Sequence, residues 1–217
     1  MEMKLVMINM ATKKIYTISV LLVIGFTTIF STCKKGGIGC ANTVYNFQIP
    51  ETLFPDKDSI HVGDTLYLKV EASSMVTDLQ SGNLIDYSNT SNLGNVITIL
   101  KFSGNETLGA INNFNLNILN GSKVGAIDQA SEEEVLFSEQ NNNYMFLISV
   151  IPKDTGRYVI TIGDAANVYR KNDQCTKANF AINFYQTDQH FYLLNKWRPD
   201  LTLDNNGKRH VYYFKVY

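Results

Sequence analysis

The stretch Asp154-Thr-Gly-Arg-Tyr-Val-Ile-Thr-Ile162 is the part of the chain that most clearly indicates its fold. Its opening residues favour a tight turn, and Tyr158, Ile160 and Ile162 then follow at alternate positions. Alternation of this kind is typical of a strand with one buried face, because successive side chains of a strand point to opposite sides of the sheet. We therefore predict a turn that leads into a strand.

Similar strand patterns recur on both sides of this stretch. We predict them at 45–49 (ended by Pro50), 66–70, 96–102, 113–119, 144–151, 180–184 and 211–217. Met75–Asn95 is rich in Ser, Asn, Gly and Asp and is expected to form a long excursion. Asp188–Trp197 has apolar residues at helical spacing and predicts a short helix, and a second is expected near Ser131, with 132–134 as its solvated acidic face. Many short strands with little helix predict a β-sandwich.

Two short segments resemble immunoglobulin-like modules. The Asp-x-Gly-x-Tyr pattern at 154–158 resembles the approach to strand F, where the tyrosine hydroxyl satisfies backbone groups at a corner. Val62-Gly63-Asp64 and the strand after it resemble the opening of bacterial extracellular modules. Ile160 stands where antibody domains have a cysteine, which excludes an antibody-type domain. The resemblance implies a mainly β, immunoglobulin-like antiparallel β-sandwich with a long excursion and one or two short helices.

The segment Met10–Cys33 has the organisation of a secretion signal. Lys13 and Lys14 precede the apolar run 15–30, which is shorter than the ~20 residues that a membrane-spanning helix needs. Phe30-Ser31-Thr32-Cys33 resembles the lipobox of bacterial lipoproteins, which implies cleavage before Cys33 and lipidation of that cysteine. The alternative is an uncleaved membrane anchor with an incidental cysteine. The expected organisation is a removed signal peptide (1–32), a lipidated tether (33–41) and one sandwich domain (42–217).

The other two cysteines, Cys40 and Cys175, form an even pair in a chain expected to enter an oxidising compartment. We predict that they are bonded to each other. Two free buried thiols are the alternative, and a metal-binding pair is a weaker one because nothing nearby in the sequence completes a ligand set.

Charge and motifs narrow the range of functions. Without Lys4, Lys13, Lys14 and Glu2, which precede Cys33, the chain carries 16 basic and 19 acidic residues. Such a balance gives no concentrated basic face for nucleic acid. No phosphate loop, nucleophile elbow, dinucleotide fingerprint or HExxH motif is present, and the three histidines are isolated in sequence. We expect no enzyme activity, no cofactor and no metal.

Aromatic residues are the remaining candidates for binding. The chain has 12 Tyr, 12 Phe and one Trp, and exposed rings among them can stack on sugars or contact proteins. Tyr192, Trp197 and Tyr213 are the candidate platform for a glycan or a protein partner; the alternative is that these rings pack the core. Ser59 and Thr65 resemble O-glycosylation acceptors of Bacteroidetes, in Asp-Ser-Ile and Asp-Thr-Leu contexts.

Together, the lipobox, the Val-Gly-Asp strand, the cysteine pair and the closing stretch Tyr212–Val216 resemble a Bacteroidetes-type lipoprotein family with an immunoglobulin-like domain of unknown function. This resemblance implies a protein anchored to the outer membrane by its N-terminal lipid. Lys34-Lys35-Gly36-Gly37 lacks the acidic residues typical of surface export, so we expect it to face the periplasm. The expected role is non-catalytic, through protein contacts or structural support; the alternative is a glycan-binding accessory lipoprotein of a polysaccharide-uptake system.

Overall fold

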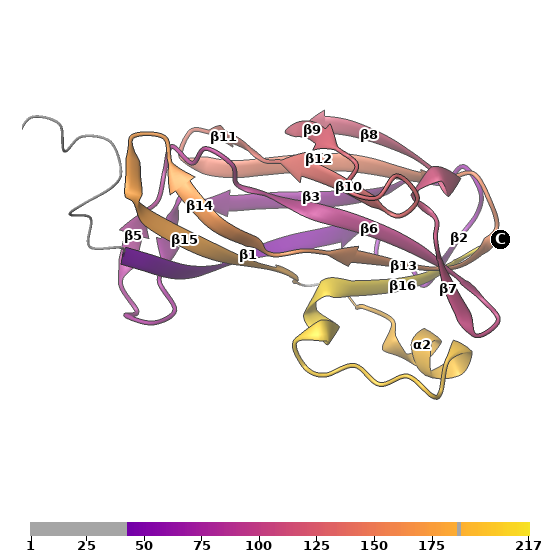
Figure 1. Ribbon diagram of the computed structural model, residues 1–217. Helices are drawn as coiled ribbons and strands as arrows, with labels where there is room; N and C mark the ends of the chain where they lie inside the picture. The colour runs from indigo at the N-terminus through magenta and orange to yellow at the C-terminus, as the bar shows by residue number, and fades with distance from the viewer. Residues whose placement is uncertain (1–42, 186–187) are drawn as a thin grey trace, which may run out of the picture. The chain divides into compact units, whose positions relative to one another are not determined.

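The computed structural model describes residues 43–185 and 188–217, and these residues form mainly β-strands (Figure 1). One seven-stranded sheet has the order β11-β12-β3-β1-β15-β14, with β8 beside β12. Its strands are β1 (Thr43–Phe54), β3 (Leu66–Ser73), β8 (Phe114–Asn120), β11 (Ser138–Gln140), β12 (Asn143–Pro152), β14 (Ala165–Arg170) and β15 (Asp173–Phe184).

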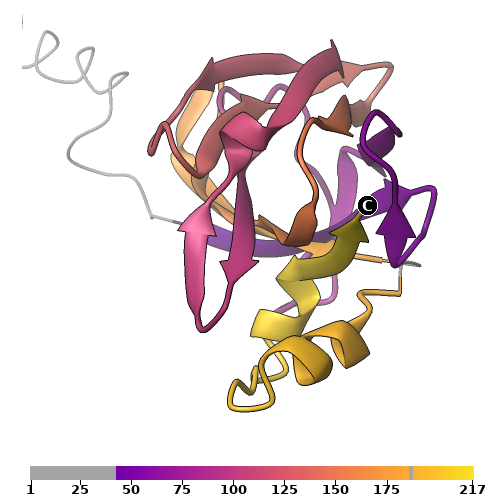
Figure 2. The same ribbon diagram turned by 90° about the vertical axis from the view of Figure 1, so that its right-hand side faces the viewer.

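The second seven-stranded sheet has the order β2-β16-β13-β6-β10-β9, with β7 beside β6. Its strands are β2 (Ser59–Ile60), β6 (Gly94–Ser103), β7 (Glu106–Gly109), β9 (Ser122–Gly125), β10 (Glu132–Leu136), β13 (Gly156–Ile162) and β16 (Val211–Val216). The view along the strands shows the two sheets wrapped around a common interior (Figure 2).

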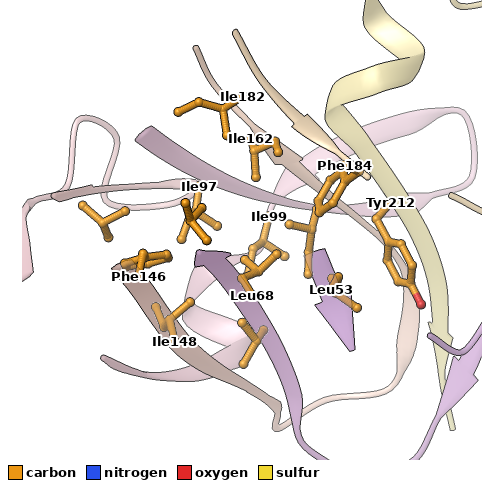
Figure 3. Packing of buried hydrophobic residues seen from close by; sticks show 14 of the residues in the cluster. Leu53, Leu68, Ile97, Ile99, Phe146, Ile148, Ile162, Ile182, Phe184 and Tyr212 are labelled. Atoms are coloured by element: carbon orange, nitrogen blue, oxygen red, sulfur yellow. The ribbon is translucent and has the colours of Figure 1, made fainter. Parts of the chain in front are cut away.

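The core lies between the two sheets. Figure 3 shows Leu68 and Ile148 of the first sheet directed toward Ile97 and Ile99 of the second, and all four side chains are fully buried. Burying an aliphatic side chain of this size contributes roughly 1.5–3 kcal/mol. The alternation seen in the sequence therefore supplies one inward face from each sheet, and the two faces together close the sandwich.

The tyrosine corner predicted from the sequence is present at the start of β13. Tyr158 is fully buried, and its hydroxyl donates to the backbone carbonyl oxygens of Asp154 (3.1 Å) and Thr155 (3.3 Å). Phe114 packs edge-on against its ring. The prediction of a mainly β, immunoglobulin-like sandwich is confirmed. Two strand pairs, β1 with β15 and β2 with β16, are nevertheless parallel.

The long excursion and the C-terminal helix are also as predicted. Residues 75–95 contain a two-stranded hairpin of β4 (Met75–Thr77) and β5 (Leu84–Asp86). Helix α2 (Phe191–Trp197) lies beside β16, where its leucines join a small second apolar cluster (Figure 1). Short 3-10 turns cover Ile111–Asn113 and Gly207–His210. Within the part of the chain that the structure describes, no helix is long and apolar enough to cross a membrane.

Two local predictions are wrong. The acidic run at 132–134 belongs to strand β10 and not to a helix, because Glu133 and Val135 alternate inward while their neighbours face outward. Glu133 is only 5% exposed and forms an ion pair with Lys123, so the run is not simply a solvated face. The first strand does not end at Pro50 but continues to Phe54.

Candidate functional site

One feature that could hold a partner is a groove where strands β1 and β3 separate. We call it the β1/β3 groove; its volume is about 440 Å³, within the range of ligand pockets. It is lined by Gln48–Pro50 of β1, Ala72 and Ser73 of β3, Met75–Thr77 of β4, and by Leu79 and Tyr185.

Pro50 explains why the two strands separate here. The β1–β3 ladder pairs Glu51–Phe54 with Tyr67–Val70 in antiparallel register and stops at Glu51. The next position in that register would place Pro50 opposite Glu71. Because proline has no backbone N–H, it cannot donate to a ladder and is rarely found between two paired strands. On its other side, β1 stays paired with β15 from Thr43 to Glu51.

The direction of the backbone groups follows from contacts on either side of the groove. The N–H of Asn46 donates to Asp78 Oδ1 (2.9 Å), and its carbonyl oxygen accepts from the N–H of Leu79 (2.8 Å), away from β15. Backbone groups alternate along a strand, so those of Gln48 and Pro50 point to the same side as those of Asn46. The printed β1–β3 register ends at the pair Glu51–Val70 and does not extend to Gln48.

The opposite wall is formed by the end of β3. The N–H of Ser74 donates to the carbonyl oxygen of Asn142. The backbone groups of the even-numbered residues of β3 therefore point toward β12. Ser73 therefore directs its backbone groups toward β1. The groove thus lies between β1 on one side and the end of β3 on the other.

The groove is uncharged, and its lining mixes apolar with uncharged polar side chains. None of its lining residues is charged. Leu79 is 60% exposed, Tyr185 is 57% exposed, and Met75 also reaches solvent. Asp78 lies behind this wall, where the N–H of Asn46 and the hydroxyl of Ser81 lower the pKa of its carboxyl. An uncharged partner therefore fits the groove better than an ionic one.

Glu51, the residue after Pro50 of the groove lining, has a buried carboxyl group. Glu51 is 0% exposed and faces the core, where its Oε2 accepts a hydrogen bond from Asn95 Nδ2 (2.7 Å). Burial raises the pKa of Glu51 to about 8, although the Asn95 hydrogen bond acts in the opposite direction. At neutral pH this carboxyl group is therefore mostly protonated. Sequence reasoning missed it, since an isolated glutamate in a strand is usually exposed.

The three aromatic residues chosen from the sequence do not form an exposed platform. Tyr213 is 3% exposed, and burial raises its pKa to about 12. Trp197 packs against it with the ring planes inclined at 73°. Tyr192 is exposed, but its hydroxyl donates to Asp58. The prediction is wrong for Tyr213 because alternation along β16 and the packing of α2 turn this ring into the second apolar cluster.

The remaining predicted residues lie away from the groove lining. Ser59 is in β2 and its hydroxyl donates to Asp58 Oδ1 (2.9 Å), while Thr65 lies just before β3 and is half-buried. Cys175 lies in β15 and is half-buried. Cys33 and Cys40 lie outside the described residues. Lipidation, the disulfide and O-glycosylation therefore stay predictions.

The histidines lie in three separate places. His61 lies 3.7 Å from Asp64, His190 3.7 Å from Asp56 and His210 3.7 Å from Asp164, each measured from a ring nitrogen to a carboxylate oxygen. Of the three, His190 is buried. Among residues 43–185 and 188–217, no three His, Cys, Asp or Glu side chains gather in an arrangement that could hold a metal ion.

Comparisons with known proteins give little further information. No protein-family model matches the chain, and no curated protein matches it. Among solved structures, the chain is similar to the cohesin module from Clostridium perfringens ATCC13124 family 33 glycoside hydrolase. The match covers 63% of this chain and 98% of that chain, with 9% identity and a TM-score of 0.30. A similarity this distant carries no argument about function.

Proposed function

We propose that this protein is a non-catalytic binding module of the cell envelope that contacts a partner protein through the β1/β3 groove. The observation that carries the proposal is the groove of about 440 Å³ beyond the last β1–β3 pair, Glu51–Val70, where the edges of the two strands are lined by uncharged side chains. Such edges bind partners through main-chain hydrogen bonds, and pockets beside them select side chains.

The lipobox supports the envelope location, and we propose that Cys33 carries the lipid that holds the domain at the outer membrane, facing the periplasm. We also propose the Cys40–Cys175 disulfide. In the parallel β1–β15 ladder Thr43 is opposite Thr176, the residue after Cys175, and only two residues separate Thr43 from Cys40 in the sequence. The bond would fasten the tether to the start of the sandwich.

A glycan-binding role is the second candidate. Tyr185 favours it, because this exposed ring lies beside the groove and the Gln48 side chain lines the same space. An aromatic ring next to an amide group is suited to stacking on a sugar and bonding its hydroxyls. The candidate residues Tyr192, Trp197 and Tyr213 do not contribute to it.

Site-specific photo-crosslinking in intact cells tests the proposed function. A photoreactive side chain replaces Leu79 in the groove or, as the control, Leu108 on β7; both leucines are at least half exposed. We expect a crosslinked protein that forms from position 79 and not from 108. The same product should disappear when Thr77→Arg places a charge in the groove. An identical product from both positions, or one unaffected by Thr77→Arg, would refute the role of the groove.

A further inference from the structure

We propose that a basic surface beside helix α2 holds the domain against an anionic phospholipid bilayer, the same membrane that receives its N-terminal anchor. The inference rests on the proposed membrane anchoring and uses a surface other than the β1/β3 groove. We call this surface the basic α2 face. It lies on the side of the sandwich where α2 flanks β16 (Figure 1), and its members are Arg157, Lys196, Lys208, Arg209 and Lys215.

The basic residues are concentrated locally, although the charge of the whole chain is nearly balanced. The stretch 191–217 has five Lys or Arg residues and two Asp residues, whereas the whole chain has 19 basic and 20 acidic residues. The fold adds Arg157 of β13 to this group, because it lies opposite Lys215 in the β13–β16 ladder. Like charges at opposite positions of neighbouring strands are destabilising. A nearby anion would relieve this repulsion.

The five side chains are available to an external anion. Within the part of the chain that the structure describes, none of them forms an ion pair with a carboxylate. Of the two acidic residues in the same stretch, Asp200 is paired with Arg198, and the carboxylate of Asp204 accepts a hydrogen bond from the N–H of Gly207. Four of the five basic residues are exposed, and Lys215 is half-buried.

Aromatic rings lie among these cations. The guanidinium carbon of Arg157 is 6.0 Å from the ring centre of Trp197, and Nζ of Lys208 is 6.0 Å from that of Phe191. Tyr192, also on α2, is 51% exposed. Trp and Tyr rings are enriched at membrane–water interfaces, and Lys and Arg beside them attract anionic headgroups. The mixture of cations and rings therefore fits a lipid surface.

The N-terminal anchor makes the bilayer the anionic partner closest to the domain. Nine residues separate Cys33 from Thr43, the first residue of β1, and a chain of this length spans at most about 35 Å. A protein anchored at Cys33 therefore keeps its domain close to the lipid. Each basic residue held near an anionic membrane strengthens attachment roughly fivefold. At this range several exposed cations suffice without a specific pocket.

Energy transfer from Trp197, the single tryptophan of the chain, tests this inference. The full-length protein, purified in detergent, is reconstituted into vesicles that contain a dansyl-labelled lipid. We expect stronger transfer to the dansyl group in vesicles of phosphatidylcholine mixed with phosphatidylglycerol than in phosphatidylcholine alone. Added salt should abolish the difference, because it screens exposed charges.

Two double variants locate the contact. Lys208→Gln with Arg209→Gln removes two charges from the basic α2 face and should lower the ratio of membrane-bound to free domain roughly 25-fold. Lys171→Gln with Lys177→Gln is the matched control. It also removes two charges, and each pair includes one lysine that lies over an aromatic ring. The control should leave the transfer unchanged.

Equal transfer in neutral and anionic vesicles would overturn the inference, and it is the result expected if the face serves an acidic protein instead. Transfer that resists Lys208→Gln with Arg209→Gln, or that falls equally in both double variants, would also overturn it. The N-terminal segment holds the protein in the vesicles through a lipid on Cys33 or through the uncleaved apolar run 15–30, so absence of the lipid does not imitate these results. Photo-crosslinking from Leu79 tests the groove independently.

Discussion

Replacing Glu51 with glutamine should make the protein more stable at neutral pH and remove a large pH dependence of its stability. Glu51 is fully buried, and its pKa is raised from 4.5 to about 8. Between these two values the unfolded chain has lost the proton while the folded protein keeps it. Stability therefore falls as pH rises through this interval and levels off above about pH 8.

The size of the effect follows from the same pKa values. Each pH unit between 4.5 and 8 changes the free energy of unfolding by about 1.4 kcal/mol. The whole interval corresponds to about 5 kcal/mol, and at pH 7 the carboxyl group costs about 3 kcal/mol. Glutamine keeps the shape and can still accept the hydrogen bond from Asn95. It has no proton to lose in the unfolded state, so this cost disappears.

Urea unfolding of the wild type and Glu51→Gln at a series of pH values from about 5 to about 8 measures this difference. The stability of the variant relative to the wild type should grow steadily with pH. Thr52→Ser is the matched control: it alters the neighbouring residue of β1 without a titratable group, so its difference from the wild type should not vary with pH. A Glu51→Gln difference that is equally flat would show that Glu51 is ionised in the folded protein at neutral pH and refute the reasoning.

Three further results are expected. Tyr158→Phe removes the hydroxyl that bonds Asp154 and Thr155 and should lower the free energy of unfolding by about 1–2 kcal/mol, measured in urea; no change would mean that the corner hydroxyl contributes nothing. Cys175→Ser should lower the melting temperature and abolish its response to reductant, since a disulfide closing a long loop contributes at most about 4–5 kcal/mol; a wild-type melt unaffected by full reduction would count against the bond. Cys33→Ala should move the protein from the membrane to the soluble fraction, and in intact cells the wild type should resist added protease until the outer membrane is permeabilised; digestion without permeabilisation would place it on the cell surface.

Periodicity and turn chemistry were sufficient to predict the fold class. Strand β13 and its corner tyrosine were visible in the sequence because they depend on neighbours a few residues away. Helix α2 followed from its apolar spacing, and the excursion at 75–95 from its composition. The acidic run at 132–134 was wrongly predicted to be helical, because the partners that make it a strand, Lys123 and strand β6, come from other segments of the chain.

The candidate site could not be predicted in the same way. Tyr213 and Trp197 are aromatic residues of the kind that form binding platforms, but helix α2, which carries Trp197, packs on β16 and buries Tyr213. The groove depends on which strands flank β1, and the long-range parallel pairing of β1 with β15 has no local sequence signal. Pro50 was recognised as a strand breaker, yet its effect is to end one ladder while the other continues.

Two consecutive residues of β1 are unfavourable for the stability of the fold. Pro50 interrupts a ladder in the interior of a sheet, and Glu51 places a carboxyl group in an apolar core, and each costs stability. Sequences that specify a fold usually agree with it at every level, and violations concentrate at functional sites. Pro50 lines the β1/β3 groove and Glu51 is the next residue, so both violations adjoin the groove. This coincidence of local costs with an open binding surface favours a groove retained for function over one left by imperfect packing.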